Sequence, residues 1–292
     1  MSKLGIVVLN YGDPSDSFNL INTLIDFNYE NLEICLVDNF SNSENLQKIK
    51  LFIDEINRSY IHFVENPNND LYSIGNNIGL LKCFNELDCS HCLVLNPDID
   101  LINLNIYEIQ NIDPKLNDLF TGKVYQNGKS SSIHIFNYFT TRSKSIKSER
   151  INFGYLPLYP SGCCWGMTKS IWENFGGFHN KKSAYYEELD YIFRFKKEFG
   201  VFPKIHTIDS LKLNHFEGGS TGASKSFFKK SEFVDYWTTR TRLRFCLDHN
   251  YLGVFSCLMI SFLQLILNLL TLRFTNSGKI FQALIDESLG RY

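Results

Sequence analysis

Two adjacent glutamates open a predicted helix, and a carboxylate can accept or release a proton. Glu187 and Glu188 open the run Leu-Asp-Tyr-Ile-Phe-Arg-Phe, which predicts a helix. Neighbouring side chains on a helix point about 100° apart, so only one of the two carboxylates should face a cleft. We expect Asp190 and Arg194, four residues apart, to form a supporting ion pair. A solvated acidic helix face is the alternative interpretation.

Short polar side chains follow three buried-looking strands. Asn10 ends the first, Asp38 and Asn39 end the second, and Asn96 and Asp98 surround the proline that ends the last. A local turn would explain any one of them, because Asn and Asp favour turns. Three strand ends of this kind on one sheet edge favour a binding site instead.

The elements that position these residues alternate between strand and helix. Short aliphatic runs predict strands, and the segments between them predict helices. The alternation predicts an α/β fold with a parallel sheet covered on both faces, and ligands bind such sheets at the carboxyl ends of the strands. The glycine-rich signatures of dinucleotide and P-loop sites are absent. The predicted strands are 4–10, 32–38, 60–65 and 91–96, and the predicted helices are 17–27, 43–57 and 75–87.

Composition narrows the class of protein further. The 292 residues are 44% hydrophobic, which excludes disorder and fibrous repeats. A formal net charge of −2 gives no overall attraction to nucleic acid. Eight cysteines are too few for a disulfide scaffold, and Met1 leads almost directly into a strand, so we expect a cytoplasmic protein.

A series of motifs, in order over about residues 4 to 220, resembles the family 2 glycosyltransferases. Within that family the pattern is most like bacterial rhamnosyltransferases of surface polysaccharide synthesis. The resemblance implies a GT-A (Rossmann-like) nucleotide-sugar-binding fold, a divalent cation and inversion by direct displacement. The motifs are Ile-Val-Val-Leu-Asn-Tyr at 6–11, Val-Asp-Asn-Phe-Ser at 37–41, Gly-Asn-Asn-Ile-Gly at 75–79, Leu-Asn-Pro-Asp at 95–98, Ser-Gly-Cys-Cys-Trp-Gly-Met at 161–167, Phe-Gly-Gly-Phe at 175–178, Tyr-Glu-Glu-Leu-Asp at 186–190 with Arg194, and His-Phe-Glu-Gly-Gly-Ser at 215–220.

The resemblance assigns residues to the nucleotide-sugar donor. Asp38 matches the family residue that accepts from N3–H of the base, which favours uracil or thymine over cytosine because a carboxylate cannot serve an acceptor-only edge. Asn10 and Asn39 are expected to line the same pocket. Gly75 and Asn77 are expected on a loop that approaches the sugar diphosphate closely, since glycine has no Cβ. A plain helix start at this position is the alternative.

The resemblance also implies a metal site. Asp98 matches the last acid of the family's Asp-x-Asp element, and His215 matches its histidine, so both are expected to bind Mg²⁺ or Mn²⁺. Asn96 stands where the family has the first acid, which leaves fewer charged ligands. The donor diphosphate should therefore supply much of the coordination. A capping Asp98 and a core His215 are the alternatives.

The remaining implied residues concern the acceptor. The family's second acid in the Glu-Asp pair is the general base, which maps to Glu188 here, with Glu187 as runner-up. Glutamate in place of aspartate shifts the carboxylate by about one bond length. Gly162 and Trp165 belong to the motif on the acceptor side.

The last seventy residues differ in character. Residues 221–250 carry six Lys/Arg and three acids, and the stretch 253–272 has no charge. The length suits a membrane span, but polar residues recur every three or four positions, which favours a helix in the membrane interface or between subunits. Arg244 and Arg273 would then meet lipid phosphates. Packing on the catalytic domain is the alternative. The polar residues are Ser261, Gln264, Asn268 and Thr271.

We therefore expect a GT-A catalytic domain over 1–220, with donor half 1–100 and acceptor half 101–220, and a helical C-terminal region over 221–292. The predicted function is transfer of a sugar from dTDP-rhamnose or a UDP-sugar to a glycan or polyprenyl-pyrophosphate-linked acceptor, in O-antigen or capsule-type synthesis at the inner face of the cell membrane. No nucleic-acid partner is expected, and the sequence leaves a homodimer as one of the alternatives. The alternatives are a catalytically impaired nucleotide-sugar-binding protein and a membrane-docked scaffold.

Overall fold

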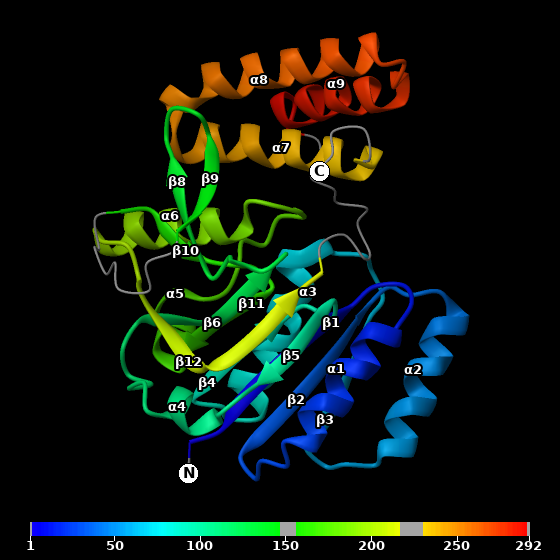
Figure 1. The fold of residues 1–292 in the computed structure, drawn as a ribbon, viewed down its shortest axis with the longest axis vertical. Helices are drawn as coiled ribbons and strands as arrows, with labels where there is room; N and C mark the ends of the chain where they lie inside the picture. The colour runs from blue at the N-terminus through cyan, green and yellow to red at the C-terminus, as the bar shows by residue number, and fades with distance from the viewer. Residues whose placement is uncertain (1, 147–155, 217–229, 291–292) are drawn as a thin grey trace.

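The computed structural model describes residues 2–146, 156–216 and 230–290. A nine-stranded sheet forms its centre, in the order β3-β2-β1-β4-β11-β6-β12-β5 with β7 beside β6 (Figure 1). The strands are β1 Leu4–Asn10, β2 Leu32–Asn39, β3 Ile61–Asn66, β4 His91–Leu95, β5 Ile99–Asn103, β6 Asp118–Gln126, β7 Lys129–Ser130, β11 Cys164–Thr168 and β12 Lys204–His215.

The first four strands confirm the predicted parallel sheet. β1 pairs in parallel with both β2 and β4, and β2 pairs in parallel with β3. Their aliphatic side chains are buried on both faces, which is why the runs are continuous rather than alternating. Beyond β4 the sheet is mixed, since β11 runs antiparallel to both β4 and β6. The α/β prediction is confirmed, with parallel pairing from β1 to β4 and mixed pairing beyond β4.

Helices cover both faces of this sheet. One core lies between the sheet and α1, α2 and α4, and a second lies between the sheet and α3, α5 and α6. A π-helical turn at Lys82–Glu86 continues α3. The helices are α1 Ser15–Asp26, α2 Ser43–Ile56, α3 Leu71–Leu81, α4 Ile106–Gln110, α5 Lys169–Phe175 and α6 Glu187–Phe199.

The expectation of a loop at Gly75 and Asn77 is wrong, because both lie inside α3. A Cβ on Gly75 would come within 2.7 Å of Leu9 Cδ1, so this glycine lets the helix pack closely on β1. Asn77 donates to the carbonyl oxygen of Phe178 and accepts from its N–H, both at 2.8 Å. Asn77 thus joins α3 to the segment that contains Phe178.

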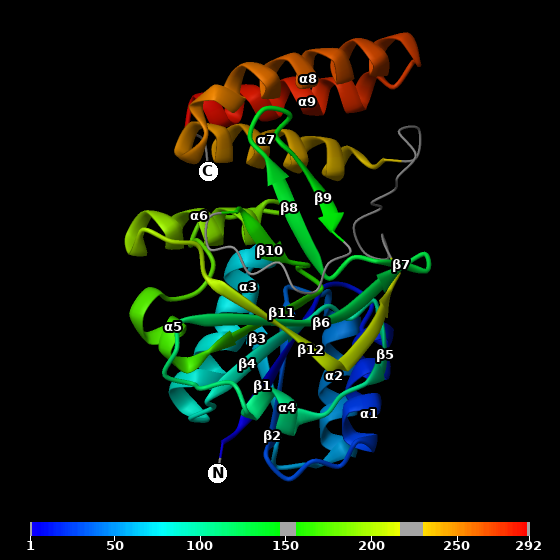
Figure 2. The same cartoon turned by 60° about the vertical axis from the view of Figure 1, so that its left-hand side comes forward.

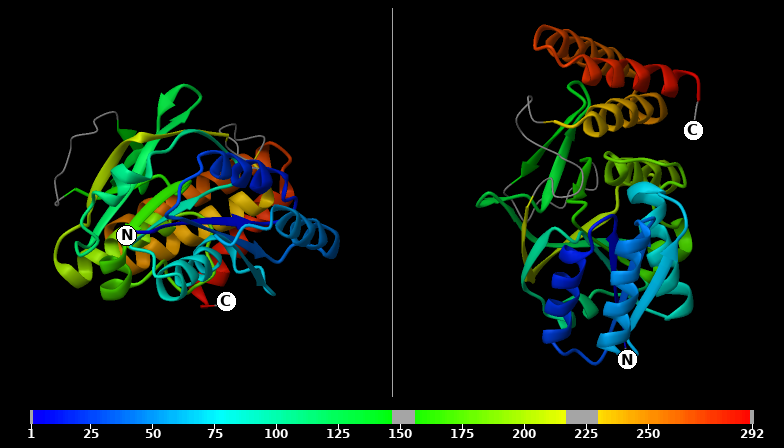
Figure 3. Two further views of the ribbon diagram at one scale, coloured as in Figure 1. Left: turned by 90° about the horizontal axis from the view of Figure 1, so that it is seen from below. Right: turned by 90° about the vertical axis from the view of Figure 1, so that its right-hand side faces the viewer.

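Three helices form a separate layer at the end of the molecule opposite the N-terminus (Figures 2 and 3). They are α7 Glu232–His249, α8 Tyr251–Leu270 and α9 Phe274–Ser288. A small sheet in the order β10-β8-β9 lies between this layer and the large sheet (Figure 2). Its strands are β8 Ile133–Asn137, β9 Arg142–Ile146 and β10 Leu158–Pro160. The predicted boundary near residue 220 falls outside the described residues.

The arginines of this layer do not face outward. Arg240 and Arg244 both pair with Glu287 of α9, at 3.0 and 2.9 Å. Arg273 lies 3.9 Å from the Asp235 carboxylate. The expectation that Arg244 and Arg273 meet lipid phosphates is therefore wrong. Arg244 of α7 pairs with α9, and Arg273, directly before α9, lies near Asp235 of α7.

Helix α8 carries its polar residues on the inside. Ser261 and Asn268 have no exposed surface, whereas Phe255 is 75% exposed and Phe262 is 62% exposed. Among the described helices α8 alone is long and apolar enough to cross a membrane, with a mean hydropathy of 2.1 over its most apolar stretch. A helix packed only on a soluble core would show the reverse arrangement.

Candidate active site

The two predicted metal ligands come together from distant parts of the chain. Asp98 follows β4, and His215 is the last residue of β12. Pairing of β12 with β5 sets His215 opposite Ile99, the residue after Asp98. The His215 Nε2 and Asp98 Oδ1 atoms are 3.5 Å apart. A carboxylate oxygen and an imidazole nitrogen at this separation fit a shared Mn²⁺ or Mg²⁺.

The charge environment of this pair couples metal binding to pH. Burial lowers the pKa of His215, but Asp98 and Cys163 together raise it to about 10. A cation that binds here must displace the proton, so its affinity should rise with pH. No group of three or more metal-ligating side chains exists among the described residues, so the donor would have to complete the coordination. The expected element Gly218-Gly219-Ser220 lies outside the described residues.

Glu188 is packed against a glycine that leaves room for its carboxylate. A Cβ built on Gly162 would lie 1.7 Å from Glu188 Oε1. The Tyr72 hydroxyl donates to the Gly162 carbonyl oxygen at 2.6 Å and fixes this loop. Burial of the Glu188 carboxyl raises its pKa to about 7. A carboxylate with a pKa in this range can accept a proton near neutral pH.

Glu187 has a different environment from its neighbour. It is 5% exposed, and its Oε1 has no hydrogen-bond partner. Burial, reinforced by the nearby Glu188 charge, raises the pKa of Glu187 well above its ordinary value. The geometry favours Glu188 over Glu187 as a base, because Glu187 is enclosed in the protein interior.

The loop of Gly162 and Cys163 lies between Glu188 and the pair Asp98–His215. Cys163 follows Gly162 and lies close enough to His215 to raise its pKa. The Cys163 carbonyl oxygen accepts from the Asn96 N–H at 3.2 Å. The candidate base and the candidate metal ligands therefore flank the same short loop, as a transfer between a metal-bound donor and an acceptor would require.

The predicted donor residues also gather at the strand ends. The Asp38 carboxylate accepts from Asn10 Nδ2 at 3.2 Å, from the Ser41 N–H at 3.0 Å and from the Ser41 hydroxyl at 2.5 Å. Asn39 Oδ1 accepts from Asn66 Nδ2 at 2.9 Å. These contacts order the loops at the sheet edge. A role for Asp38 in recognition of a base stays a prediction.

Trp165 is the predicted site residue that burial argues against. Its side chain has no exposed surface. It packs against Phe178 and Tyr191, with ring centroids 5.4 and 5.2 Å away. Trp165 therefore belongs to the core beneath the acceptor side, and a direct contact with an acceptor would require the core to open.

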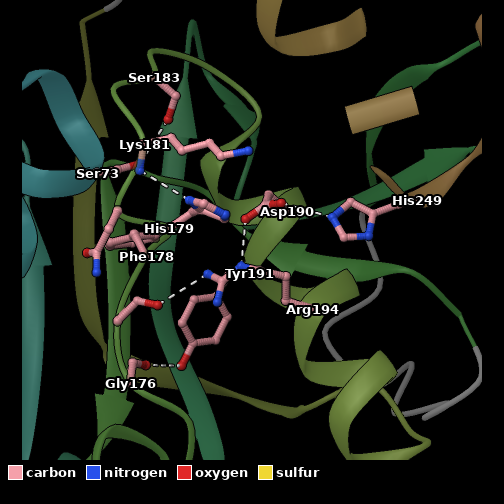
Figure 4. Close-up of polar contacts among 12 residues, drawn as sticks. Ser73, Gly176, Phe178, His179, Lys181, Ser183, Asp190, Tyr191, Arg194 and His249 are labelled. Atoms are coloured by element: carbon pink, nitrogen blue, oxygen red, sulfur yellow. Dashed lines mark hydrogen bonds and ion pairs between the residues drawn. The ribbon is translucent and has the colours of Figure 1, made fainter. Parts of the chain in front are cut away.

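The predicted ion pair of α6 is confirmed, and a third residue joins it. Asp190 accepts from Arg194 Nε at 2.7 Å, and its other oxygen lies 2.9 Å from His249 Nε2 (Figure 4). Arg194 also donates to the Gly177 carbonyl oxygen at 3.2 Å. His249 is the last residue of α7, so the C-terminal layer contacts α6, the helix that carries Glu188.

Sequence reasoning missed three residues beside the candidate base. Tyr72 lies in α3, Cys163 directly follows Gly162, and His249 is the last residue of the distant helix α7. No local sequence pattern predicts that Tyr72 or His249 contacts a residue of another helix or loop. The Gly-Cys-Cys-Trp motif offered the only signal for Cys163.

Comparisons with known proteins bear on the whole chain. No protein-family model matches it. The hexosyltransferase Agl10 of low-salt glycan biosynthesis in Haloferax volcanii is 26% identical over 223 residues, which cover 72% of this chain and 67% of Agl10. The structure of GalNAc-T7 with UDP, GalNAc and Mn²⁺ matches with a TM-score of 0.58 at 13% identity, over 81% of this chain and 48% of that one.

A second solved structure extends the likeness to the C-terminal helices. The mannosyltransferase PcManGT from Pyrobaculum calidifontis, in complex with GDP-Man and Mn²⁺, matches with a TM-score of 0.56 at 9% identity, over 99% of this chain and 88% of that one. The chain has the GT-A fold, and that fold, the curated relative and the site geometry together support a glycosyltransferase.

Proposed function

We propose that this glycosyltransferase inverts the anomeric centre of a hexosyl donor, dTDP-rhamnose or a UDP-sugar, and transfers the sugar to a glycan or a polyprenyl-pyrophosphate-linked acceptor. One observation carries the proposal. The Glu188 carboxyl, whose pKa burial raises to about 7, lies against Gly162, and the adjacent Cys163 borders the Asp98–His215 pair. O-antigen or capsule-type synthesis is the proposed setting.

The proposed step needs one base. Glu188 takes the proton of the acceptor hydroxyl while that oxygen bonds to the anomeric carbon. The bond from the anomeric carbon to the diphosphate oxygen breaks on the opposite face, and the diphosphate leaves with the electron pair. A bound Mg²⁺ or Mn²⁺, held by Asp98 and His215, would neutralise charge on the diphosphate.

The relatives support the donor and metal classes. GalNAc-T7 was solved with UDP and Mn²⁺, PcManGT with GDP-Man and Mn²⁺, and Agl10 is a hexosyltransferase of glycan biosynthesis. The choice of a uridine or thymidine donor rests on Asp38, whose carboxylate suits a base that presents an N–H.

Turnover with a donor panel tests the proposal. Parent protein is incubated with UDP-, dTDP- and GDP-sugars, lipid-linked acceptor and Mn²⁺ or Mg²⁺, and the product linkage is read by NMR. Transfer with inverted configuration is expected from dTDP-rhamnose or a UDP-sugar. Retained configuration would refute the single-base step. Donor binding by thermal shift without transfer to any acceptor would favour the nucleotide-sugar-binding alternative.

We also propose that the enzyme works at the inner face of the cell membrane, with α8 in the interface. The buried polar residues and exposed phenylalanines of α8 support this. Each phenylalanine would contribute about 1.5–3 kcal/mol of burial. Phe255→Gln and Phe262→Gln should each lower vesicle binding about tenfold or more, whereas Tyr107→Gln, on the 58% exposed Tyr107 of α4, should not. If the protein forms a stable dimer and does not bind vesicles, this face of α8 contacts a second copy of the chain instead.

A further inference from the structure

The segment before the candidate base has a backbone that local sequence does not favour. Tyr185 and Tyr186 have φ values of 74° and 68°, so two bulky residues in a row are left-handed directly before α6. Such residues are strained in this conformation and persist only where surrounding contacts hold them. Contacts from elsewhere in the chain must therefore set the start of α6, and with it the position of Glu188.

Helix α7 supplies several of these contacts, beside those that Ser183 makes with Ser73 and Lys182 makes with Asp70. Four of its side chains reach residues 182–190, on both sides of Glu188 in the chain. In Figure 1, α6 lies directly beneath α7. The contacts are Arg244 Nη1 to the Lys182 carbonyl oxygen at 3.2 Å, Thr241 Oγ1 to the Ala184 carbonyl oxygen at 3.3 Å, Arg242 Nε to the Tyr186 hydroxyl at 3.1 Å, and His249 Nε2 to the Asp190 carboxylate at 2.9 Å.

Arg242 differs from the other arginines of α7. Arg240 and Arg244 share the Glu287 carboxylate. Arg242 forms no ion pair with the residues that the structure describes, and its Nη1 is buried without a hydrogen-bond partner. Burial of a charged group without a counter-charge is costly. The hydrogen bond from Arg242 Nε to the Tyr186 hydroxyl is the polar contact that its side chain does make, and we take it as the reason for an arginine at this position.

The Tyr186 hydroxyl links this arginine to the acceptor half. It accepts from Arg242 and donates to the Thr141 carbonyl oxygen at 2.7 Å. Both hydrogen-bonding roles of the hydroxyl are thus satisfied, and the ring is held between α7 and the small sheet. Two residues later, the Glu188 carboxylate meets Gly162.

We propose that Arg242 is a positioning residue for the transfer reaction: through Tyr186 it holds the start of α6 so that Glu188 lies against Gly162. This proposal rests on the proposed function, in which Glu188 is the base. It also assigns the C-terminal layer a part in catalysis, since α7 belongs to that layer.

The test compares Arg242→Met and Tyr186→Phe with a matched control, Arg240→Met, in the full chain. The control removes a guanidinium from the same helix but leaves the contact to Tyr186. The readouts are kcat, the KM for the donor, the pH dependence of kcat and the thermal midpoint. Tyr186→Phe keeps the ring and removes the hydroxyl, and with it the bonds to both Arg242 and the Thr141 carbonyl oxygen. Arg242→Lys leaves the Thr141 bond in place, so the two variants together report on the contact even if Arg242→Met does not fold.

Arg242→Met and Tyr186→Phe should each lower kcat by about 10- to 100-fold, with the donor KM changed less than about twofold. The double variant should be little worse than either single one, because both break the same contact. A looser start of α6 admits water to Glu188, so the acid limb of the kcat profile should move to lower pH. Arg242→Lys should restore part of kcat.

Other results overturn the proposal. If both variants keep the kcat and pH profile of Arg240→Met, or lose activity only in step with their thermal midpoints, Arg242 is merely structural. The Glu188→Gln variant separates this failure from that of the proposed function. If Glu188→Gln is as active as the parent, the base is misassigned; if it is inactive while the Arg242 and Tyr186 variants are normal, only the positioning role is wrong.

Discussion

Gly162→Ala is a substitution that should spare the fold and disable the site. The added methyl group would lie 1.7 Å from Glu188 Oε1 and 2.9 Å from its Cδ, and no other residue's atoms are among its three nearest neighbours. The φ of Gly162 lies outside the left-handed region, so alanine can adopt the backbone conformation. The overlap can therefore be relieved by the flexible end of one side chain.

The size of the effect follows from that overlap. Ordinary van der Waals contact begins at 3.4 Å, so the Glu188 oxygen must withdraw by about 1.7 Å. A misplacement of about 1 Å in a reacting group can cost 10²-fold in rate. We expect kcat to fall by about 10²-fold or more, which corresponds to about 2.7 kcal/mol in the activation free energy. The free energy of unfolding should change by less than about 1 kcal/mol.

The assay measures initial rates of product formation over a range of donor concentrations, with a urea titration of each variant. Gly278→Ala is the matched control, because a Cβ at that position has no neighbour within 4 Å. A kcat for Gly162→Ala within about twofold of the parent would refute the placement of Glu188. A large loss of stability together with activity would show that the loop, rather than the carboxylate, had moved.

Three further predictions concern the same elements. Because Glu188 must be deprotonated to act as a base, kcat should fall as the pH drops below about 7. Glu188→Gln should remove this dependence and lower kcat by roughly 10²- to 10⁴-fold. A pH series of initial rates measures both effects. Asp98→Ala and His215→Ala should each weaken Mn²⁺-dependent donor binding in calorimetry, and the double variant should bind the donor little more weakly than either single variant. Full activity in excess chelator would contradict the metal assignment. Asn77→Ala should cost about 1–3 kcal/mol in urea unfolding with an unchanged donor KM, since its side chain bonds to both backbone polar groups of Phe178 and to the Asn180 side chain. A raised KM would return it to the donor site.

The strand ends could be predicted because each depends on a few adjacent residues. Asn10, Asp38 and Asp98 follow aliphatic runs, and the parallel order of such runs brings their ends to one edge. The start of α3 could not be predicted in this way. Asn39 Oδ1 accepts from the Asp70 N–H at 3.2 Å and its Nδ2 donates to the Leu71 carbonyl oxygen at 3.2 Å, so a strand end elsewhere in the chain sets where this helix begins.

The C-terminal arginines were misread for the same physical reason. A cluster of cations before an uncharged helix suits a membrane surface, and nothing nearby in the sequence reveals Glu287 as the counter-charge for Arg240 and Arg244. The polar residues of α8 were identified correctly as a stripe, but their direction depends on α7 and α9. Sequence periodicity shows that a helix has two faces, and only packing decides which face is inside.

The site therefore depends on two kinds of order. The metal pair and the donor residues are fixed by the register of the large sheet, since His215 stands opposite Ile99 and Asn10 opposite Asp38. Glu188 is fixed differently, by a strained turn that α7 holds in place. Arg240 and Arg244 in turn join α7 to α9 through Glu287, so the proposed positioning of Glu188 depends on the packing of the C-terminal layer.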